Sequence, residues 1–144
     1  MSERPSPNAA EGYRIFFSYS RKDTGIAKLM IERMEREVAG IEVFFDVRRI
    51  EGGDPVPAVI RETIKGCREL LVLLSVNSLK SSWVRIEVAA AWGRERRIVP
   101  INYDVTPRDV RDILPIIADL DVIMLADFEE YITQLSRRVK EGQG

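Results

Sequence analysis

The stretch LLVLLSVNSLKSSWVRIEVAAAW, residues 70–92, decides the fold. It opens with an unbroken apolar run, residues 70–74, which is typical of a short strand buried on both faces of a sheet. The polar segment Ser75 to Ser82 is predicted to be a loop. From Trp83 onward the pattern is helical, and Ser81 or Ser82 is placed to cap the first turn. In parallel α/β sheets, ligands bind where a buried strand ends and a helix begins.

Glu87 is the exceptional residue of this helix. At about 100° per residue it falls among the apolar residues, so a carboxylate lies in the stripe that should face the protein. Burying a charge there without a partner is expensive. One interpretation is structural: Glu87 lies at the margin, pairs with Arg94 or another base, and is stabilised by the helix dipole. The other is chemical: Glu87 is a catalytic carboxylate at the mouth of a cleft, with Trp83 beside it to stack on a ring.

The composition is that of an ordinary soluble globular domain. Of its 144 residues 45% are hydrophobic and 31% are charged, and the net charge is −1. We therefore expect one domain with a real core and no overall field that recruits nucleic acid or a membrane. No apolar run is long enough to span a bilayer, and the N-terminal segment lacks the apolar core of a secretory signal. The single cysteine, Cys67, fits a reducing cytoplasm, which is the predicted location.

The sequence contains no histidine. This excludes the Ser-His-Asp triad, Cys-His pairs and the usual zinc and iron ligand sets, so no metal site is predicted. Catalysis would have to use carboxylates, lysine, tyrosine or the one cysteine. We interpret Cys67 as a small core residue near the end of a helix.

Strands and helices alternate along the chain. The first helix is predicted to stop at Gly40, and Asp23 or Thr24 is placed to cap its start. Pro100 predicts a bulge or a local gap in the fourth strand. Residues 1–12 are predicted to be a disordered tail, 13–140 the folded domain, and 141–144 a frayed end or the start of a linker. The predicted strands are Tyr13–Ser18, Ile41–Phe45, Leu70–Leu74, Arg97–Asn102 and Val122–Leu125, with further helices at Ala58–Gly66, Pro107–Leu114 and Asp127–Lys140.

Five β-α repeats imply a parallel sheet with helices on both faces. We predict an α/β, flavodoxin-like, three-layer fold whose five-stranded sheet has the order 2-1-3-4-5, with its switch point between the first and third strands. Three segments should converge on the crevice there, namely Ser18–Asp23, Asp46–Pro57 and Ser75–Glu87. The glycine pair of the middle segment is not a P-loop, because no Gly-Lys-Ser/Thr follows it.

These three segments resemble the three signature boxes of the Toll/interleukin receptor (TIR) domain, and the resemblance covers roughly residues 13–139. The Trp-x-x-x-Glu spacing of Trp83 and Glu87 matches the enzymatic, NAD-cleaving branch of that family. The quoted matches are Ile15-Phe16-Phe17-Ser18-Tyr19-Ser20 with Asp23, then the loop from Asp46 with Gly52–Gly53, and finally Leu74-Ser75-Val76-Asn77-Ser78 with Ser82-Trp83 and Glu87.

The resemblance implies two classes of function. One is a non-catalytic scaffold, in which TIR domains bind one another through the loop after the second strand, here Arg48–Pro57. The other is an NAD⁺ glycohydrolase that releases nicotinamide and ADP-ribose or a cyclic variant, is activated by self-association, and serves bacterial defence or signalling. Glu87 matches the catalytic glutamate of the enzymes, which adaptor-type members commonly lack, so the enzyme is the preferred prediction. A more distant alternative is nucleoside transfer, because nucleoside 2-deoxyribosyltransferases resemble this fold.

A lone carboxylate suits cleavage of NAD, which would be a substrate and not a cofactor. Nicotinamide in NAD is already a cationic leaving group, and the ribose passes through an oxocarbenium-like state that a carboxylate can stabilise or trap. Further contacts are less specific, since strand aromatics usually pack in cores. The residues predicted to contact NAD are Phe17, Ser18, Tyr19, Asp46, Ser75 and Trp83, with Arg48, Arg49 and Lys80 as candidate partners of the diphosphate.

Overall fold

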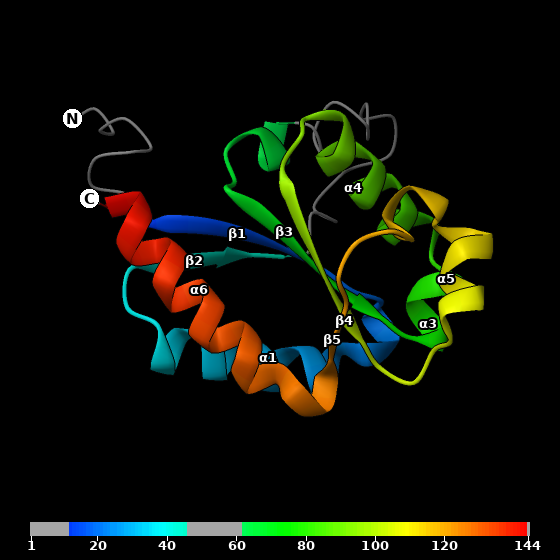
Figure 1. Ribbon diagram of the computed structural model, residues 1–144, viewed down its shortest axis with the longest axis horizontal. Helices are drawn as coiled ribbons and strands as arrows, with labels where there is room; N and C mark the ends of the chain where they lie inside the picture. The colour runs from blue at the N-terminus through cyan, green and yellow to red at the C-terminus, as the bar shows by residue number, and fades with distance from the viewer. Residues whose placement is uncertain (1–11, 46–61, 144) are drawn as a thin grey trace.

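The computed structural model describes residues 12–45 and 62–143. They form a five-stranded parallel sheet in the order β2-β1-β3-β4-β5 with helices on both faces, which confirms the predicted flavodoxin-like fold class (Figure 1). The predicted tail and the segment Asp46–Pro57 lie outside the described residues, apart from Gly12. The strands are β1 (Tyr13–Ser18), β2 (Ile41–Phe44), β3 (Glu69–Leu74), β4 (Arg97–Asn102) and β5 (Ile123–Met124).

The helices follow the predicted order with two differences. A short helix, α3, occupies part of the predicted polar loop, because Ser75 and Ser78 form a reciprocal capping box that stabilises one helical turn. The last helix continues through residues 141–143, which were predicted to be frayed or the start of a linker. The helices are α1 (Thr24–Glu37), α3 (Val76–Leu79), α4 (Ser82–Gly93), α5 (Pro107–Ile113) and α6 (Phe128–Gln143), and residues 62–65 are also helical.

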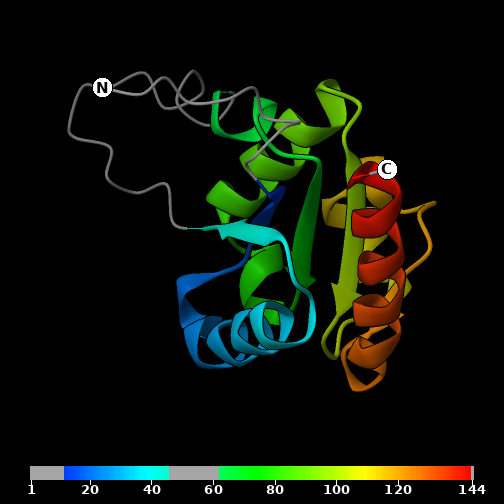
Figure 2. The same ribbon diagram turned by 90° about the vertical axis from the view of Figure 1, so that its left-hand side faces the viewer.

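Alternating side chains of the strands build one apolar core on each face of the sheet. Ile15 and Phe17 of β1 pack with α1 and α6, whereas Phe16 between them packs with α4 and α5. Figures 1 and 2 show these two helix layers on either side of the sheet. Every residue of β3 is buried, as expected for a central parallel strand with both faces covered.

Two turn and core predictions are confirmed locally. Gly40 has a φ of 83°, a backbone conformation that glycine adopts without strain, and it turns the chain from α1 into β2. Cys67 is buried, and its thiol donates to the Thr63 carbonyl at 3.4 Å. Burial raises the pKa of the Cys67 thiol to about 12, so this cysteine is a core residue and not a reactive thiolate.

The prediction for Pro100 was a bulge or a local gap in the ladder, and no bulge forms toward β3, because the β3–β4 register continues through the pair Val72↔Pro100. The Tyr103 amide donates to the Leu74 carbonyl at 2.7 Å, so odd-numbered residues of β4 direct their amides toward β3. Pro100 therefore faces the opposite side, where β5 pairs only with Ile101 and Asn102. The missing donor lies on the edge of β4 that β5 does not reach.

A fully buried carboxylate, Glu69, anchors α6 at the start of β3. The Arg138 Nε and Nη2 groups donate to its two oxygens at 2.9 and 3.0 Å, which is the bidentate geometry of strong arginine–carboxylate pairs. The Tyr13 and Tyr131 hydroxyls add hydrogen bonds at 2.6 and 2.8 Å. Burial opposes the charge of Arg138, but the hydrogen bonds and charge of Glu69 outweigh it and raise the Arg138 pKa. We call these four residues the Glu69 cluster.

The Glu69 cluster makes stability sensitive to alkaline pH. Burial and then the charge of Glu69 raise the pKa of Tyr13 from 10.0 to about 12, and the same causes raise the pKa of Tyr131. The unfolded chain therefore loses these protons first, so we expect the free energy of unfolding to be undiminished below pH 10 and to fall as the pH rises through about 12. Urea unfolding across this range checks it. Tyr13→Phe should show a shallower alkaline decline, and equal declines in both proteins would contradict the assignment.

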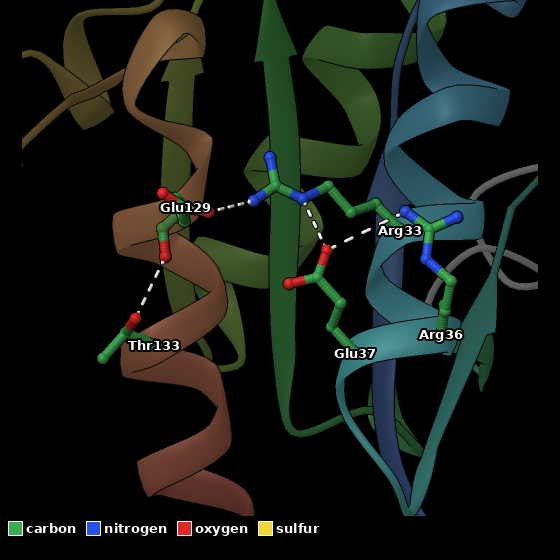
Figure 3. A network of polar contacts seen from close by, with 5 residues as sticks. All are labelled: Arg33, Arg36, Glu37, Glu129 and Thr133. Atoms are coloured by element: carbon green, nitrogen blue, oxygen red, sulfur yellow. Dashed lines mark hydrogen bonds and ion pairs between the residues drawn. The ribbon is translucent and has the colours of Figure 1, made fainter.

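An exposed ion-pair network joins α1 to α6 on the outer surface. Figure 3 shows Arg33 between Glu37 of its own helix, at 2.7 Å, and Glu129 of α6, at 2.9 Å. Such exposed pairs contribute about 0–1 kcal/mol each, so the buried Glu69 cluster and not this network dominates the attachment of α6. Among the helices that the structure describes, none combines the length and apolar character needed to cross a membrane.

Candidate functional site

The site lies at the carboxyl ends of β1 and β3, where the strand order reverses. Ser18 ends β1 and pairs in register with Val72 of β3, while Ser75 directly follows the last residue of β3. Both serine side chains are buried at the sheet edge. Each donates a hydrogen bond to a buried carboxylate, and these two carboxylates come from different connections of the fold.

The first carboxylate is Glu87, whose side chain is only 3% exposed. It lies on the inward stripe of α4 with Val84, Val88 and Ala91, which confirms the sequence pattern. The Ser18 hydroxyl donates to Glu87 Oε1 at 2.6 Å. Ser18 lies two positions after Phe16 in β1, so the two side chains point to the same face of the sheet, which is the face covered by α4. The suggested partner Arg94 is instead exposed at the C-cap of α4.

The second carboxylate is Asp23, which is 6% exposed. It stands at the N-cap position of α1, but its side chain does not cap that helix, so the predicted capping role is wrong. Its Oδ2 accepts from the Ser75 hydroxyl at 2.5 Å and its Oδ1 accepts from the Asn77 amide at 2.8 Å. Capping of the preceding turn falls to Ser20, which accepts from the Lys22 amide at 3.2 Å.

Aromatic rings extend from the core toward this edge. Phe17 is 1% exposed and belongs to the core beneath α1 and α6. Tyr19 lies 5.0 Å from Phe17, measured between ring centroids, and 6.3 Å from Phe45, which is 43% exposed. Trp83 is half-buried in the first turn of α4 and packs against the core on that face. The sequence pattern gave no reason to single out Phe45, because it appeared only as the last residue of a strand.

The structure brings some predicted residues together and leaves others outside its description. Ser18 contacts Glu87, and Ser75 contacts Asp23. Lys80 is exposed at the C-cap of α3. Contacts of NAD with Phe17, Ser18, Tyr19, Ser75 and Trp83 stay predictions, as does a diphosphate role for Lys80. The predicted residues Asp46, Arg48 and Arg49, and the Arg48–Pro57 loop, lie outside the described residues.

The arrangement defines what Glu87 can do chemically. A hydroxyl that donates to a carboxylate favours its ionised form and fixes the direction in which the charge points. A fixed negative charge in a site with little water can stabilise a positive charge that develops on a bound molecule. The Ser18–Glu87 pair has no imidazole to complete a hydrolytic triad, since the sequence contains no histidine.

Comparisons with known proteins agree with this fold. A family model for the TIR domain matches residues 15–137. The probable 2′ cyclic ADP-D-ribose synthase BdTIR of Brachypodium distachyon is 28% identical over 122 residues, covering 83% of this chain and 53% of that protein. The NAD(+) hydrolase TirS of Staphylococcus aureus is 30% identical over 132 residues, covering 85% of this chain and 46% of that protein.

The chain thus spans about half the length of these curated relatives. Among solved structures, the TIR domains of the activated Roq1 resistosome share the fold with a TM-score of 0.63 at 20% identity, covering 89% of this chain and 99% of that one. The match of the family model includes both serine–carboxylate pairs, because Ser18, Asp23, Ser75 and Glu87 all lie within residues 15–137. This chain belongs to the TIR domain family.

Proposed function

We propose that this domain cleaves NAD at the bond between nicotinamide and ribose, releasing nicotinamide and ADP-ribose or a cyclic variant. The observation that carries the proposal is the buried Glu87 carboxylate, hydrogen-bonded to Ser18 at the carboxyl edge of the sheet. A carboxylate is seldom buried on an otherwise apolar helix stripe, and a residue in such a position is a candidate for a functional role. The relatives named as an NAD(+) hydrolase and a probable 2′ cyclic ADP-D-ribose synthase support this chemistry.

In the proposed reaction the glycosidic C–N bond breaks, and its electron pair moves to the nicotinamide nitrogen. The ring leaves as neutral nicotinamide, so no general acid is needed. The positive charge that remains on the ribose is stabilised by the Glu87 carboxylate, which Ser18 holds in place. Attack by water then gives ADP-ribose and a proton, whereas attack by a hydroxyl of the same molecule gives a cyclic product and a proton.

Phe45, whose ring is exposed, follows β2 and lies 6.3 Å from the buried ring of Tyr19, and Trp83 begins the helix that carries Glu87. We propose that these rings hold the flat nicotinamide and adenine groups by stacking. The single cysteine supports the proposal that the domain acts in the cytoplasm.

Incubation of the concentrated protein with NAD is expected to release one nicotinamide for each NAD consumed. Chromatography that separates nicotinamide, ADP-ribose and cyclic products measures the nicotinamide released and the ribose-containing product. The second product shows whether water or a hydroxyl of the same molecule attacks the ribose. The same assay on a fusion to an oligomerising partner tests activation by self-association. Absence of nicotinamide from both forms would overturn the proposed activity.

A second candidate function is a scaffold that assembles with other TIR domains. It is favoured by the fold shared with TIR domains of an assembled resistosome. We propose that self-association, with the Arg48–Pro57 loop as a contact, couples assembly to NAD loss in bacterial defence or signalling. Sedimentation combined with the nicotinamide assay distinguishes the two candidates, because both form oligomers but only a non-catalytic scaffold leaves NAD intact.

A further inference from the structure

The two serine–carboxylate pairs cross between the two connections at the switch point. Ser18 belongs to β1, but it binds Glu87, which lies on the helix after β3. Ser75 follows β3, but it binds Asp23, which lies between β1 and α1. The end of β1 is therefore hydrogen-bonded to the helix that follows β3, and the end of β3 is hydrogen-bonded to the segment that follows β1. The two ties together fix the β3–α4 connection against β1 from both ends.

Asp23 binds these distant residues instead of capping its own helix. An aspartate at an N-cap normally accepts a hydrogen bond from an amide in the first turn of its own helix. Asp23 makes no such bond and reaches residues 52 and 54 positions away in sequence. Within the described structure its two oxygens are each occupied, by the Ser75 hydroxyl and the Asn77 amide. These contacts place Asp23 to hold Ser75 and Asn77.

The residues held by Asp23 determine where α4 begins. Ser75 is also the N-cap of α3, and its hydroxyl oxygen accepts from the Ser78 amide at 3.0 Å. The Ser81 amide in turn donates to the Ser78 carbonyl at 3.0 Å, and Ser81 caps α4. A continuous chain of hydrogen bonds therefore runs from Asp23 to the start of the helix that carries Glu87.

We propose that Asp23 is a positioning residue that keeps the Glu87 carboxylate on Ser18 and directed at the ribose. This inference rests on the proposed NAD cleavage. A displacement of about 1 Å in a catalytic group can reduce a rate by about 100-fold. Loss of the Asp23 tie should therefore lower kcat more than it changes KM, because Asp23 is proposed to act through the position of Glu87 and not through contact with the substrate.

The role requires the shape of Asp23 and not its charge. In Asp23→Asn the new side-chain oxygen accepts from Ser75, and its amide nitrogen donates to Asn77 once the Asn77 amide turns over. Asp23→Ala makes neither bond. We expect Asp23→Ala to lower kcat at least about 10-fold with KM within about 2-fold, and Asp23→Asn to keep kcat within about 3-fold of the wild type. A residue that only stabilised the fold would change the folded fraction and leave kcat per folded molecule unaltered.

A readout that does not depend on turnover is available because the chain has two tryptophans, Trp83 and Trp92. Trp92 is 58% exposed on the outer side of α4, so Trp92→Phe leaves Trp83 as a reporter of the helix start. In that background Asp23→Ala should increase quenching of Trp83 by acrylamide, and Asp23→Asn should not. Asp109→Ala is the matched control, since Asp109 is an exposed acid in the capping box of α5.

The outcomes separate this inference from the proposed function. If Asp23→Asn is as inactive as Asp23→Ala, the charge matters and the positioning role is overturned. The role is also overturned if Asp23→Ala keeps wild-type kcat and wild-type quenching. If the wild type releases no nicotinamide but Asp23→Ala still loosens Trp83, the tie stands and the NAD chemistry fails. Should Asp23→Ala not fold, Asn77→Ala removes only the half-buried arm of the tie and is expected to give a smaller change of the same kind.

Discussion

Glu87→Gln is expected to reduce the rate of nicotinamide release by about 100- to 1,000-fold while leaving the fold intact, because removal of one preorganised electrostatic group typically costs that much. Glutamine has nearly the same volume, and its side-chain oxygen can still accept the Ser18 hydrogen bond that Glu87 accepts at 2.6 Å. The substitution therefore removes the negative charge and keeps this hydrogen bond. Measurement of kcat, together with the thermal midpoint of each protein, separates catalysis from stability.

Two control variants sharpen this test. Ser18→Ala removes the donor but keeps the carboxylate, so we expect a smaller loss of about 10-fold, in line with a misplaced but charged group. Glu95→Gln changes an exposed glutamate just beyond the C-terminal end of α4 and should leave kcat unaltered. Nicotinamide release by Glu87→Gln within about 3-fold of the wild type would show that the buried charge has no part in the chemistry.

The fold was predictable because its determinants are local. The apolar run of β3 and the stripe of α4 are periodic patterns, so they reveal burial without knowledge of any partner. The inward position of Glu87 followed from the same helical period. Its hydrogen-bond partner could not be predicted, because Ser18 lies 69 positions earlier and only the sheet register brings the two together.

The misses have the same physical origin. Asp23 was one of two predicted caps, with Thr24 as the alternative, because a local pattern favours that role, yet its carboxylate binds groups more than 50 residues away. Glu69 was left outside the strand predicted at Leu70–Leu74, although it begins β3 and is fully buried. Its partners Tyr131 and Arg138 lie 62 and 69 positions further on, so nothing near Glu69 in the sequence indicates that it is satisfied in the core.

Arg138→Met is expected to lower the free energy of unfolding by about 3–5 kcal/mol, the typical effect of removing one partner from a buried ion pair. Arg138 donates two hydrogen bonds to Glu69, whose side chain is 0% exposed, so the variant leaves a buried carboxylate with only tyrosine hydroxyls as donors. Methionine retains much of the apolar stem of arginine, which limits the loss of packing. Urea unfolding measures the change, and a thermal midpoint lower by about 10 °C should accompany it.

The neighbouring substitution Arg137→Met is the matched control, because Arg137 is exposed on the same helix and should change stability by less than about 0.5 kcal/mol. The double variant Glu69→Gln/Arg138→Met removes both charges and leaves an amide that the tyrosine hydroxyls can still reach. It should regain much of the lost stability, as expected when both partners of a buried pair are neutralised. Arg138→Met with a loss below about 1 kcal/mol would show that the Glu69 cluster does not hold α6 to the sheet.

Arg138→Met also tests whether the Glu69 cluster, which stabilises the fold, influences the candidate site. Glu69 begins β3, whereas Ser75 follows the opposite end of the same strand, so the cluster and the candidate site are divided by the length of a buried strand. Well below its thermal midpoint, Arg138→Met should therefore keep the wild-type kcat for nicotinamide release. A kcat reduced in step with Glu87→Gln would mean that the attachment of α6 controls the site, and the site could not then be assigned to the β1–β3 edge alone.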